Sequence, residues 1–270
     1  MLEFLQQYFP EVDTSVWITR MHKGEVLDAD GLRIMPDHPY RAGTQIYYYR
    51  ELEFETPIPF EEIILFQDEH LLVVDKPHFL PVIPSGRFLH ETLLVRLKKK
   101  LQLEHLTPIH RLDRETAGVM LFSPDQASRG DYQSLFHQRE IYKVYEALAA
   151  TLPRYSPFPL THRSRMIRGE PFFRMQEVPG VPNTETHIEI LENRGDTTLY
   201  RLRPVTGKKH QLRVHLAALG IPIINDRLYP ELLAEKADDF LLPLQLVARS
   251  ISFKDPYTGE KRHFESGKFL

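Results

Sequence analysis

The apolar residues of this chain follow a helical spacing in some segments and an extended one in others. Leucines recur every three or four residues within 90–101, and again from Thr206 to about Gly220, so both segments are predicted to be helices. Short apolar runs bounded by turn residues are typical of strands, and they lie at 63–66, 71–74, 109–112, 119–122, 141–148, 187–191, 198–202 and 244–253. The pattern indicates strands mixed with helices rather than a helical bundle.

The first fifty residues have a pattern of their own. Residues 2–8 and about 14–22 are predicted to form two short helices separated by Pro10. Asp30-Gly31 lies between short apolar segments, which is a signal for a hairpin turn. The tyrosine-rich residues 44–52 are then predicted to form a strand.

Residues 56–59, which contain two prolines, interrupt this pattern and suggest a linker. We therefore expect a small N-terminal domain over residues 1–52 and a larger domain over 53–270. Within the larger domain, Ser123 is expected to cap a helix that runs to about Gln138. The segment 153–181 is rich in proline and arginine and is expected to be irregular.

Composition narrows the class of protein. Of the 270 residues, 42% are hydrophobic and 26% are charged, which is ordinary for a soluble globular protein. No apolar run approaches the roughly 20 residues that a membrane-spanning helix needs. Cysteine is absent, which excludes disulfides, thiolate metal sites, iron–sulfur clusters and cysteine nucleophiles. The first residues lack the pattern of a secretory signal, so we expect a cytoplasmic protein.

The net charge does not by itself indicate a nucleic-acid-binding protein. The chain has 34 basic and 37 acidic residues, a formal charge of −3 at pH 7 with histidine neutral. Proteins that bind nucleic acid usually have an obvious basic excess. An acidic outer surface can nevertheless coexist with a basic cleft, because binding depends on where the charges lie.

One segment concentrates ionisable side chains between two apolar runs. Five of the six residues from His110 to Glu115 are ionisable, and Asp113 has Arg111 and Arg114 nearby. Arginines on both sides should lower the pKa of the Asp113 carboxyl and keep it ionised. Such a carboxylate can act as a nucleophile or stabilise a nearby cation. The alternative, favoured on composition alone, is a salt-bridged surface turn.

A second candidate segment runs from Thr206 to His215. Thr206 can cap the predicted helix, and the free backbone N–H groups of a helix N-terminus favour an anion such as phosphate. Lys209 and Arg213 are four residues apart and should share a helix face. The alternative is an ordinary amphipathic helix with a basic outer side. His210 and His215 are five apart, a poor spacing for a shared metal, so no metal site is expected.

A third candidate lies in the predicted strand 141–148. Lys143, Tyr145 and Ala147 alternate onto one face of that strand and could line a cleft. The alternative is that Tyr145 is simply a packed strand aromatic. Basic residues within 162–168, followed by Phe172 and Phe173, form a mixture that can stack on bases. Packing within a loop explains that mixture equally well.

Together these segments resemble the RluA-type pseudouridine synthase family. The resemblance covers most of residues 60–260 and rests on five blocks in order, of which His-Arg-Leu-Asp with a following Thr-x-Gly is the most specific. The blocks are 65–77, 110–118, 143–147, 206–215 and 244–260. The resemblance implies an α+β fold with a mixed, mostly antiparallel central sheet around a long cleft. It also implies that a uridine in RNA is converted to pseudouridine without a metal or other cofactor.

The same resemblance implies roles for individual residues. Asp113 matches the essential aspartate, and Arg213 matches the basic residue that pairs with it. Tyr145 matches the tyrosine that stacks near the target base and is a candidate for removing the proton from carbon 5. Arg111 matches the arginine thought to fill the gap left by the flipped nucleotide, and Leu212 the neighbouring apolar position. The blocks also contain further residues expected to bind the RNA substrate, namely His110, Lys143 and Lys209.

The chain departs from the family pattern outside these catalytic positions. Lys208 stands where the family commonly has arginine, and a lysine lacks the bidentate fork for phosphate. The usual Gly-Asp-x-x-Tyr-Gly is Asn225-Asp226-Arg-Leu-Tyr229-Pro230, and His78 replaces a common glycine. We therefore expect activity to be kept and target choice to be unusual. Residues 1–52 more loosely resemble an alpha-L RNA-binding domain, with a plain structural cap as the alternative.

We thus expect an RNA pseudouridine synthase that acts on ribosomal or transfer RNA. The expected partner is RNA, with no membrane and no obligatory protein partner, and a monomer is expected. A second hypothesis is a non-catalytic RNA-binding or ribosome-assembly factor that keeps the synthase fold. A third is a carboxylate-dependent glycosidase, which needs two carboxyl groups about 5 to 9.5 Å apart; Glu115 would be the local candidate for the second.

Overall fold

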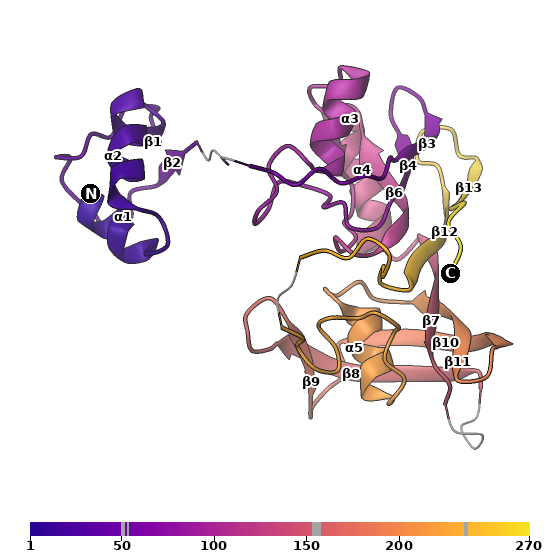
Figure 1. Cartoon of the computed structure of the whole chain (residues 1–270). Coiled ribbons are helices and arrows are strands. Elements are labelled where there is room, and N and C mark those ends of the chain that lie inside the picture. Colours follow the sequence, from indigo (N-terminus) through magenta and orange to yellow (C-terminus); the bar gives the residue numbers. More distant parts are fainter. Residues whose placement is uncertain (50–51, 53, 153–157, 235–236) are drawn as a thin grey trace. The chain divides into compact units, whose positions relative to one another are not determined.

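A computed structural model describes residues 1–49, 52, 54–152, 158–234 and 237–270, and it divides the chain into two units, Met1–Phe54 and Glu55–Leu270 (Figure 1). Residue 53, on one side of the expected domain boundary, and residues 50 and 51 of the expected strand 44–52 lie outside this set. Among the described residues, no helix is long and apolar enough to cross a membrane.

The N-terminal unit packs two helices on a two-stranded sheet. Its elements are α1 (Leu2–Tyr8), α2 (Thr14–Lys23), β1 (Val26–Asp28) and β2 (Ile46–Tyr48). Asp13 caps α2 by accepting the backbone N–H of Ser15 at 2.8 Å. Buried residues from the helices, β1 and the segment after the Asp30-Gly31 turn form the core, namely Leu5, Trp17, Met21, Val26 and Ile34.

The expected hairpin at Asp30-Gly31 is present but short. β1 pairs with β2 on one side, and across the turn an isolated antiparallel bridge joins Leu27 to Arg33. Two backbone hydrogen bonds flank this bridge, from the N–H of Asp28 to the carbonyl of Leu32 and from the N–H of Ile34 to the carbonyl of Val26, both at 2.9 Å. The Asp28 carboxylate closes the turn by accepting the backbone N–H groups of Asp30 at 3.0 Å and Leu32 at 2.8 Å.

The larger unit is built on an eleven-stranded sheet in the order β3-β4-β6-β12-β7-β11-β10-β8-β9, with β13 beside β12 and β5 beside β6. Every pairing is antiparallel except β12 with β6. This confirms the expected α+β fold with a mixed, mostly antiparallel sheet. The strands are β3 (Ile63–Gln67), β4 (Leu72–Lys76), β5 (Thr107–Pro108), β6 (Ala117–Ser123), β7 (Tyr142–Ala150), β8 (Leu160–Arg168), β9 (Met175–Val178), β10 (Thr184–Asn193), β11 (Thr197–Pro204), β12 (Leu246–Lys254) and β13 (Lys261–Glu265).

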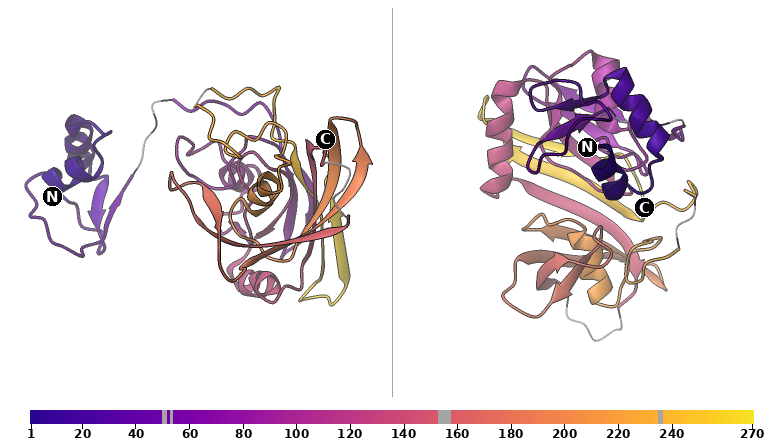
Figure 2. Two further views of the ribbon diagram at one scale, coloured as in Figure 1. Left: turned by 90° about the horizontal axis from the view of Figure 1, so that it is seen from below. Right: turned by 90° about the vertical axis from the view of Figure 1, so that its left-hand side faces the viewer.

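Helices cover both faces of one half of this sheet. Every residue of β4 and β6 is buried, since α3 (Leu93–Leu101) packs on one face and α4 (Gln126–His137) on the other. Burial on both faces explains why these strands appear as continuous apolar runs. On the other half, α5 (Gln211–Ala218) packs through Leu212 and Leu216 against β7, β10 and β11. β7 and β12 run between the two halves (Figure 2).

One glycine is required where the two halves meet. Gly118 has a φ of +116°, and a Cβ there would lie 2.3 Å from the carbonyl oxygen of Ala248. Gly118 and Ala248 are partners in the one parallel pairing, so the backbones of β6 and β12 approach closely at this point. The glycine of the Thr-x-Gly motif is therefore needed to close the sheet directly after the loop that carries Asp113.

Two expectations about helix starts were wrong. The helix after β6 begins at Gln126 with Asp125 as its N-cap, because the Asp125 carboxylate accepts the Ser128 N–H at 2.9 Å and Ser123 belongs to β6. α5 begins at Gln211 rather than Thr206. His210, with a φ of +56°, is left-handed and separates the preceding loop from the helix.

The expectation that 153–181 is irregular was also wrong, although residues 153–157 lie outside those described. β8 and β9 form a hairpin there. Along β8 the half-buried His162 and Ser164 alternate with the exposed Arg163 and Arg165. Because the inward positions are themselves polar, the two-residue period does not appear as a hydrophobic pattern.

Candidate active site

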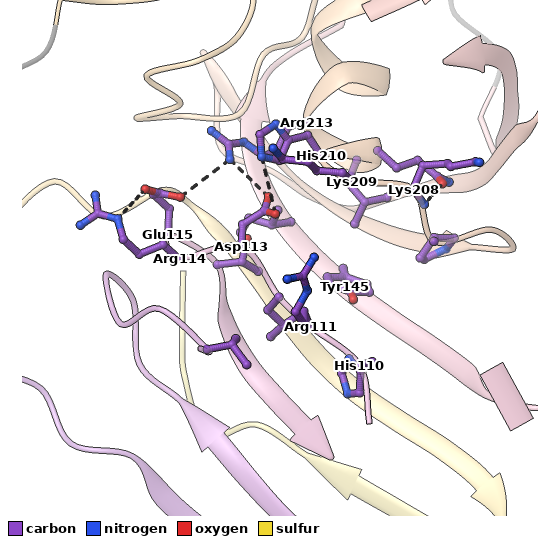
Figure 3. A pocket seen from close by; sticks show the side chains of 18 of the residues that line it. His110, Arg111, Asp113, Arg114, Glu115, Tyr145, Lys208, Lys209, His210 and Arg213 are labelled. Atoms are coloured by element: carbon purple, nitrogen blue, oxygen red, sulfur yellow. Dashed lines mark hydrogen bonds and ion pairs between the residues drawn. The ribbon is translucent and has the colours of Figure 1, made fainter. Parts of the chain in front are cut away.

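A cleft of about 700 Å³ lies in the larger unit, where the loop before β6, strand β7 and the segment 204–213 meet. All eight residues singled out in the sequence line it, together with Arg114, Glu115, Phe173, Lys208 and His210 (Figure 3). The eight are His110, Arg111, Asp113, Lys143, Tyr145, Lys209, Leu212 and Arg213. Segments a hundred residues apart in the chain thus supply one site.

The loop that carries Asp113 is fixed by buried polar contacts. The ammonium of Lys76, at the end of β4, is fully buried and donates to the carbonyl oxygens of Arg114 at 2.9 Å and Leu80 at 2.8 Å. Burial lowers the pKa of Lys76 to about 7. Arg114 in turn donates to both carboxylate oxygens of Asp238, at 2.9 and 2.8 Å. The backbone beside Asp113 is therefore held from two separate segments.

Asp113 faces the guanidinium of Arg213. Nη1 of Arg213 lies 3.2 Å from Oδ2 of Asp113, while its Nε and Nη2 donate to Asp226 at 2.8 and 2.7 Å. Arg213 is only 2% exposed. A buried guanidinium between two carboxylates is charge-compensated and cannot rotate freely. Asp226 thereby orients the Arg213 guanidinium that contacts Asp113.

The charges around Asp113 keep its carboxyl ionised. Burial by itself raises the pKa of Asp113, but the charges of His210 and Arg213, the Arg213 hydrogen bond and Lys209 outweigh that effect and lower it. The pKa of His210 is itself lowered, first by burial, so its imidazole is neutral near pH 7. At that pH the compensating positive charge comes from Arg213 and Lys209.

His210 and Tyr229 complete this cluster and were not foreseen from the sequence as site residues. Nε2 of His210 lies 3.7 Å from Oδ1 of Asp113, and its Nδ1 lies 2.8 Å from the Tyr229 hydroxyl. The ring of Tyr229 lies under the guanidinium of Arg213, 5.5 Å from its centroid. The motif from Asn225 to Pro230 was noted only as a departure, yet it supplies both Asp226 and Tyr229.

Tyr145 enters the cleft from β7. Burial and the charge of Asp113 both raise the pKa of its phenol, so the hydroxyl stays protonated at neutral pH. Leu212 lines the same cleft from the first turn of α5 and is nearly buried. An aromatic ring and an aliphatic side chain in one cleft suit a planar base.

Four cations of the cleft have no acidic partner among the described residues. No carboxylate in the described ranges of the chain forms an ion pair with Arg111, Lys143, Lys208 or Lys209. Burial lowers the pKa of Lys143. We call these four side chains the cation rim. Unpaired cations beside a cleft favour an anionic ligand.

His110 has a different environment from the cation rim. Its Nε2 accepts the backbone N–H of Leu121 at 3.1 Å, and its ring lies 4.8 Å from that of Phe136. Burial and the charge of Lys143 lower its pKa to about 3, so it is neutral at physiological pH. It joins the start of the Asp113 loop to β6.

One group of side chains outside the cleft has the residue types of a metal site. The ligand atoms of His162, Glu177 and His215 lie within 4.8 Å of one another. Hydrogen bonds already join them to protein partners: His162 to Glu177 at 2.9 Å, and His215 to Thr184 at 3.0 Å. These hydrogen bonds link β8 to β9 and α5 to β10.

The cleft combines two chemical capacities. An ionised carboxylate beside a fixed guanidinium can attack an electrophilic carbon or remove a proton. The cation rim can bind a polyanion next to that carboxylate.

The phosphate site expected at a helix starting with Thr206 is not formed. Thr206 donates to the Gln211 side chain at 2.7 Å, and α5 begins only at Gln211.

Comparison with known proteins points to one family. A family model described as RNA pseudouridylate synthase matches residues 70–218. The dual-specificity RNA pseudouridine synthase RluA of Vibrio vulnificus is 34% identical over 76% of this chain and 82% of its own. Mouse pseudouridylate synthase RPUSD2 is 32% identical over 84% of this chain, which spans only 40% of that protein. The solved structure of human RNA pseudouridylate synthase domain containing 4 matches with a TM-score of 0.59 and 29% identity, covering 75% of this chain and 87% of that one.

Proposed function

The chain belongs to the RNA pseudouridylate synthase family, and we propose that it converts uridines of structured ribosomal or transfer RNA to pseudouridine, with Asp113 as the essential carboxylate. In this reaction the N-glycosidic bond breaks, the uracil turns over, and a carbon–carbon bond forms through carbon 5. The observation that carries the assignment is the ionised Asp113 carboxylate 3.2 Å from a buried Arg213 inside the cleft.

We assign Asp113 and Arg213 to the chemical step. Asp113 can attack the sugar, attack the base or remove a sugar proton, and all three begin from the ionised carboxylate. An unpaired carboxylate in a closed cleft would take up a proton. Arg213 opposes this once RNA excludes water, and Asp226 keeps Arg213 in place.

We assign Tyr145 and Leu212 to holding the uracil. The target base cannot be turned over within a stack, so the nucleotide must be flipped into the cleft. The phenol of Tyr145 stays protonated at neutral pH, and a protonated phenol is a weak base. Stacking on the uracil therefore suits Tyr145 better than removing the proton from carbon 5. Leu212 supplies the apolar surface next to it.

We assign the cation rim to the RNA backbone. Arg111 is proposed to occupy the gap that the flipped nucleotide leaves, while Lys143, Lys208 and Lys209 bind phosphates. Support comes from their position on the cleft and their lack of acidic partners in the described chain. Such contacts position RNA without reading its sequence, so target choice should depend on loop bases and RNA shape.

The N-terminal unit is proposed to add RNA contacts. Tyr47 and Tyr49 are 56% and 64% exposed, and exposed aromatic rings can stack on unpaired bases. If the double variant Tyr47→Ala, Tyr49→Ala leaves RNA affinity unchanged, the structural-cap alternative is favoured.

We further propose a cytoplasmic monomer with no obligatory protein partner. Sedimentation of the purified protein with and without RNA checks the oligomeric state.

The test is tritium release from RNA labelled at carbon 5 of uridine, because that hydrogen is lost only if carbon 5 is the atom that re-bonds. The RNA comes from cells lacking this gene, so that its target is unmodified, and is fractionated into ribosomal and transfer RNA. Wild-type protein should release tritium from one fraction and Asp113→Asn from neither. No release by either protein, with tight RNA binding kept, would favour the non-catalytic binding factor.

A further inference from the structure

We propose that the Tyr229 hydroxyl fixes one tautomer of His210, so that His210 presents an Nε2–H donor to the Oδ1 atom of Asp113. His210 is then a positioning residue for the catalytic carboxylate, and Tyr229 acts through it. The inference rests on the proposed function only where it calls Asp113 catalytic. The tautomer itself follows from the contacts around Tyr229.

The direction of the hydrogen bonds decides the tautomer. The Tyr229 oxygen accepts the backbone N–H of Met175 at 2.8 Å and lies 2.8 Å from Nδ1 of His210. Tyr229 is 4% exposed. If His210 donated through Nδ1, the Tyr229 hydroxyl hydrogen would have no acceptor among the described residues. Leaving a buried donor unsatisfied is costly, so the hydroxyl donates to Nδ1, and the ring hydrogen of His210 is on Nε2.

That hydrogen points toward the catalytic carboxylate. Nε2 of His210 lies 3.7 Å from Oδ1 of Asp113, while Arg213 takes the other oxygen, Oδ2, at 3.2 Å (Figure 3). A separation of 3.7 Å is too long for a hydrogen bond. Catalytic hydrogen bonds often tighten only when substrate is bound. Held by two different donors, the carboxylate would be fixed in rotation about its Cβ–Cγ bond.

A neutral donor suits this position better than a second cation. Burial lowers the pKa of His210, Asp113 opposes that effect, Arg213 and Lys209 add to it, and Glu115 again opposes it. The imidazole is consequently neutral near pH 7. A second full positive charge beside Arg213 would stabilise the ionised carboxylate further and lower its nucleophilicity. A neutral N–H orients Oδ1 with a weaker effect on its reactivity.

Three elements fix the ring of His210 and its partner. His210 precedes α5 with a φ of +56°, and its ring meets that of Tyr229 edge-on at 5.6 Å. Tyr229 also lies under the guanidinium groups of Arg213 and Arg174, at 5.5 and 5.1 Å. β9 supplies the Met175 N–H. The Tyr229 hydroxyl is therefore held in place with Nδ1 of His210 as the acceptor of its hydrogen.

The first experiment measures the tautomer by long-range ¹⁵N–¹H NMR of the full-length protein, with the His210 signals identified from their loss in His210→Asn. In the wild type we expect an unprotonated Nδ1 and a protonated Nε2. In Tyr229→Phe, which removes only the hydroxyl, we expect the Nδ1 signal to move toward that of a mixed tautomer. A wild-type Nδ1–H, or no change in Tyr229→Phe, would overturn the proposal.

The second experiment measures single-turnover tritium release at saturating enzyme, together with RNA affinity. We expect His210→Asn to lower the rate constant about tenfold to a hundredfold, the effect of losing a hydrogen bond to a charged group, while RNA affinity changes less than about twofold. Asparagine tolerates a positive φ, so this variant should fold. Tyr229→Phe should have a smaller effect in the same direction.

A rescue variant separates positioning from a structural role. The amide of His210→Gln reaches the place of Nε2, whereas that of His210→Asn does not, although glutamine suits the positive φ less well. We expect His210→Gln to recover most of the lost rate. A wild-type rate in His210→Asn, or no recovery in His210→Gln, would overturn the positioning role. A wild type that releases no tritium contradicts the proposed function instead, and the NMR measurement still decides the tautomer.

Discussion

The charges beside Asp113 and the charges of the cation rim differ in whether they form ion pairs. Beside Asp113 the buried charge is paired: Arg213 lies between Asp113 and Asp226, and the Arg213–Asp226 pair is nearly inaccessible to water. In the cation rim, Lys143 and Lys208 line the same cleft without an ion pair to any described carboxylate. Paired buried charges hold a fixed geometry, while unpaired cations attract whatever anion approaches. The difference suggests that one side performs the chemistry and the other binds RNA.

Among changes that keep every charge, the largest effect is expected from moving the carboxylate. Asp113→Glu keeps the carboxylate but displaces it by about one bond length from Arg213, and such a misplacement costs about a hundredfold or more. We expect the single-turnover rate of tritium release to fall by at least that factor. Glu115→Gln is the matched control, since it removes the neighbouring carboxylate. A rate loss in Glu115→Gln equal to that in Asp113→Glu would instead support two acting carboxyl groups.

A smaller loss is expected from the partner of the carboxylate. Arg213→Lys keeps the charge but cannot contact Asp113 and Asp226 together, so we expect about a tenfold slower single turnover.

Arg213→Ala tests the effect of the charge itself. Arg213 lowers the pKa of Asp113, so its removal raises that pKa. As pH falls, the active carboxylate is then lost at a higher pH than in the wild type. The pH–rate profile should therefore move its acid limb upward, with thermal melting as a check on folding. An unmoved acid limb in a folded variant would count against the ion pair.

The cation rim should affect binding and leave the chemical step alone. We expect Lys143→Ala combined with Lys208→Ala to weaken RNA binding about fivefold at physiological salt. The slope of log affinity against log salt should fall by about one to two, because two phosphate contacts are lost. Removing Lys98 and Lys99 of α3, which lie outside this cleft, is the matched control. Equal effects of the two double variants would show that only net charge matters.

The smallest effect is expected from the family substitution at one rim position. Lys208→Arg introduces the arginine that the family resemblance led us to expect and keeps the charge, so affinity should change by no more than about twofold. A phosphate that needed a bidentate contact would instead gain clearly from arginine. Filter-binding titrations at two salt concentrations separate these results.

The sequence predicted features that depend on local spacing or on short motifs. Leucine stripes gave α3, and the ionisable cluster around Asp113 pointed to the cleft before its shape was known. β8 was missed because half of its inward side chains are polar. The start of α5 was placed too early because the left-handed turn at His210 has no local signal that distinguishes it from helix.

The polar contacts behind Asp113 could not be predicted from the sequence. Lys76 contacts the carbonyl of Arg114, and His210 contacts Tyr229, only because distant segments fold together. Single histidines and tyrosines have no periodicity, and the partner of a buried hydrogen bond is set by tertiary packing. The motif residues were found, while the residues that orient them were not.

One comparison tests most directly whether Asp113 performs the chemical step while the cation rim only binds RNA. Single-turnover tritium release is measured at increasing enzyme concentration for Asp113→Asn and for Lys143→Ala with Lys208→Ala, until the RNA is saturated. If these roles are correct, the double lysine variant reaches the wild-type rate constant at saturation, and Asp113→Asn releases no tritium at any concentration. Release by Asp113→Asn, or a double lysine variant that stays slow when its RNA is saturated, would contradict them.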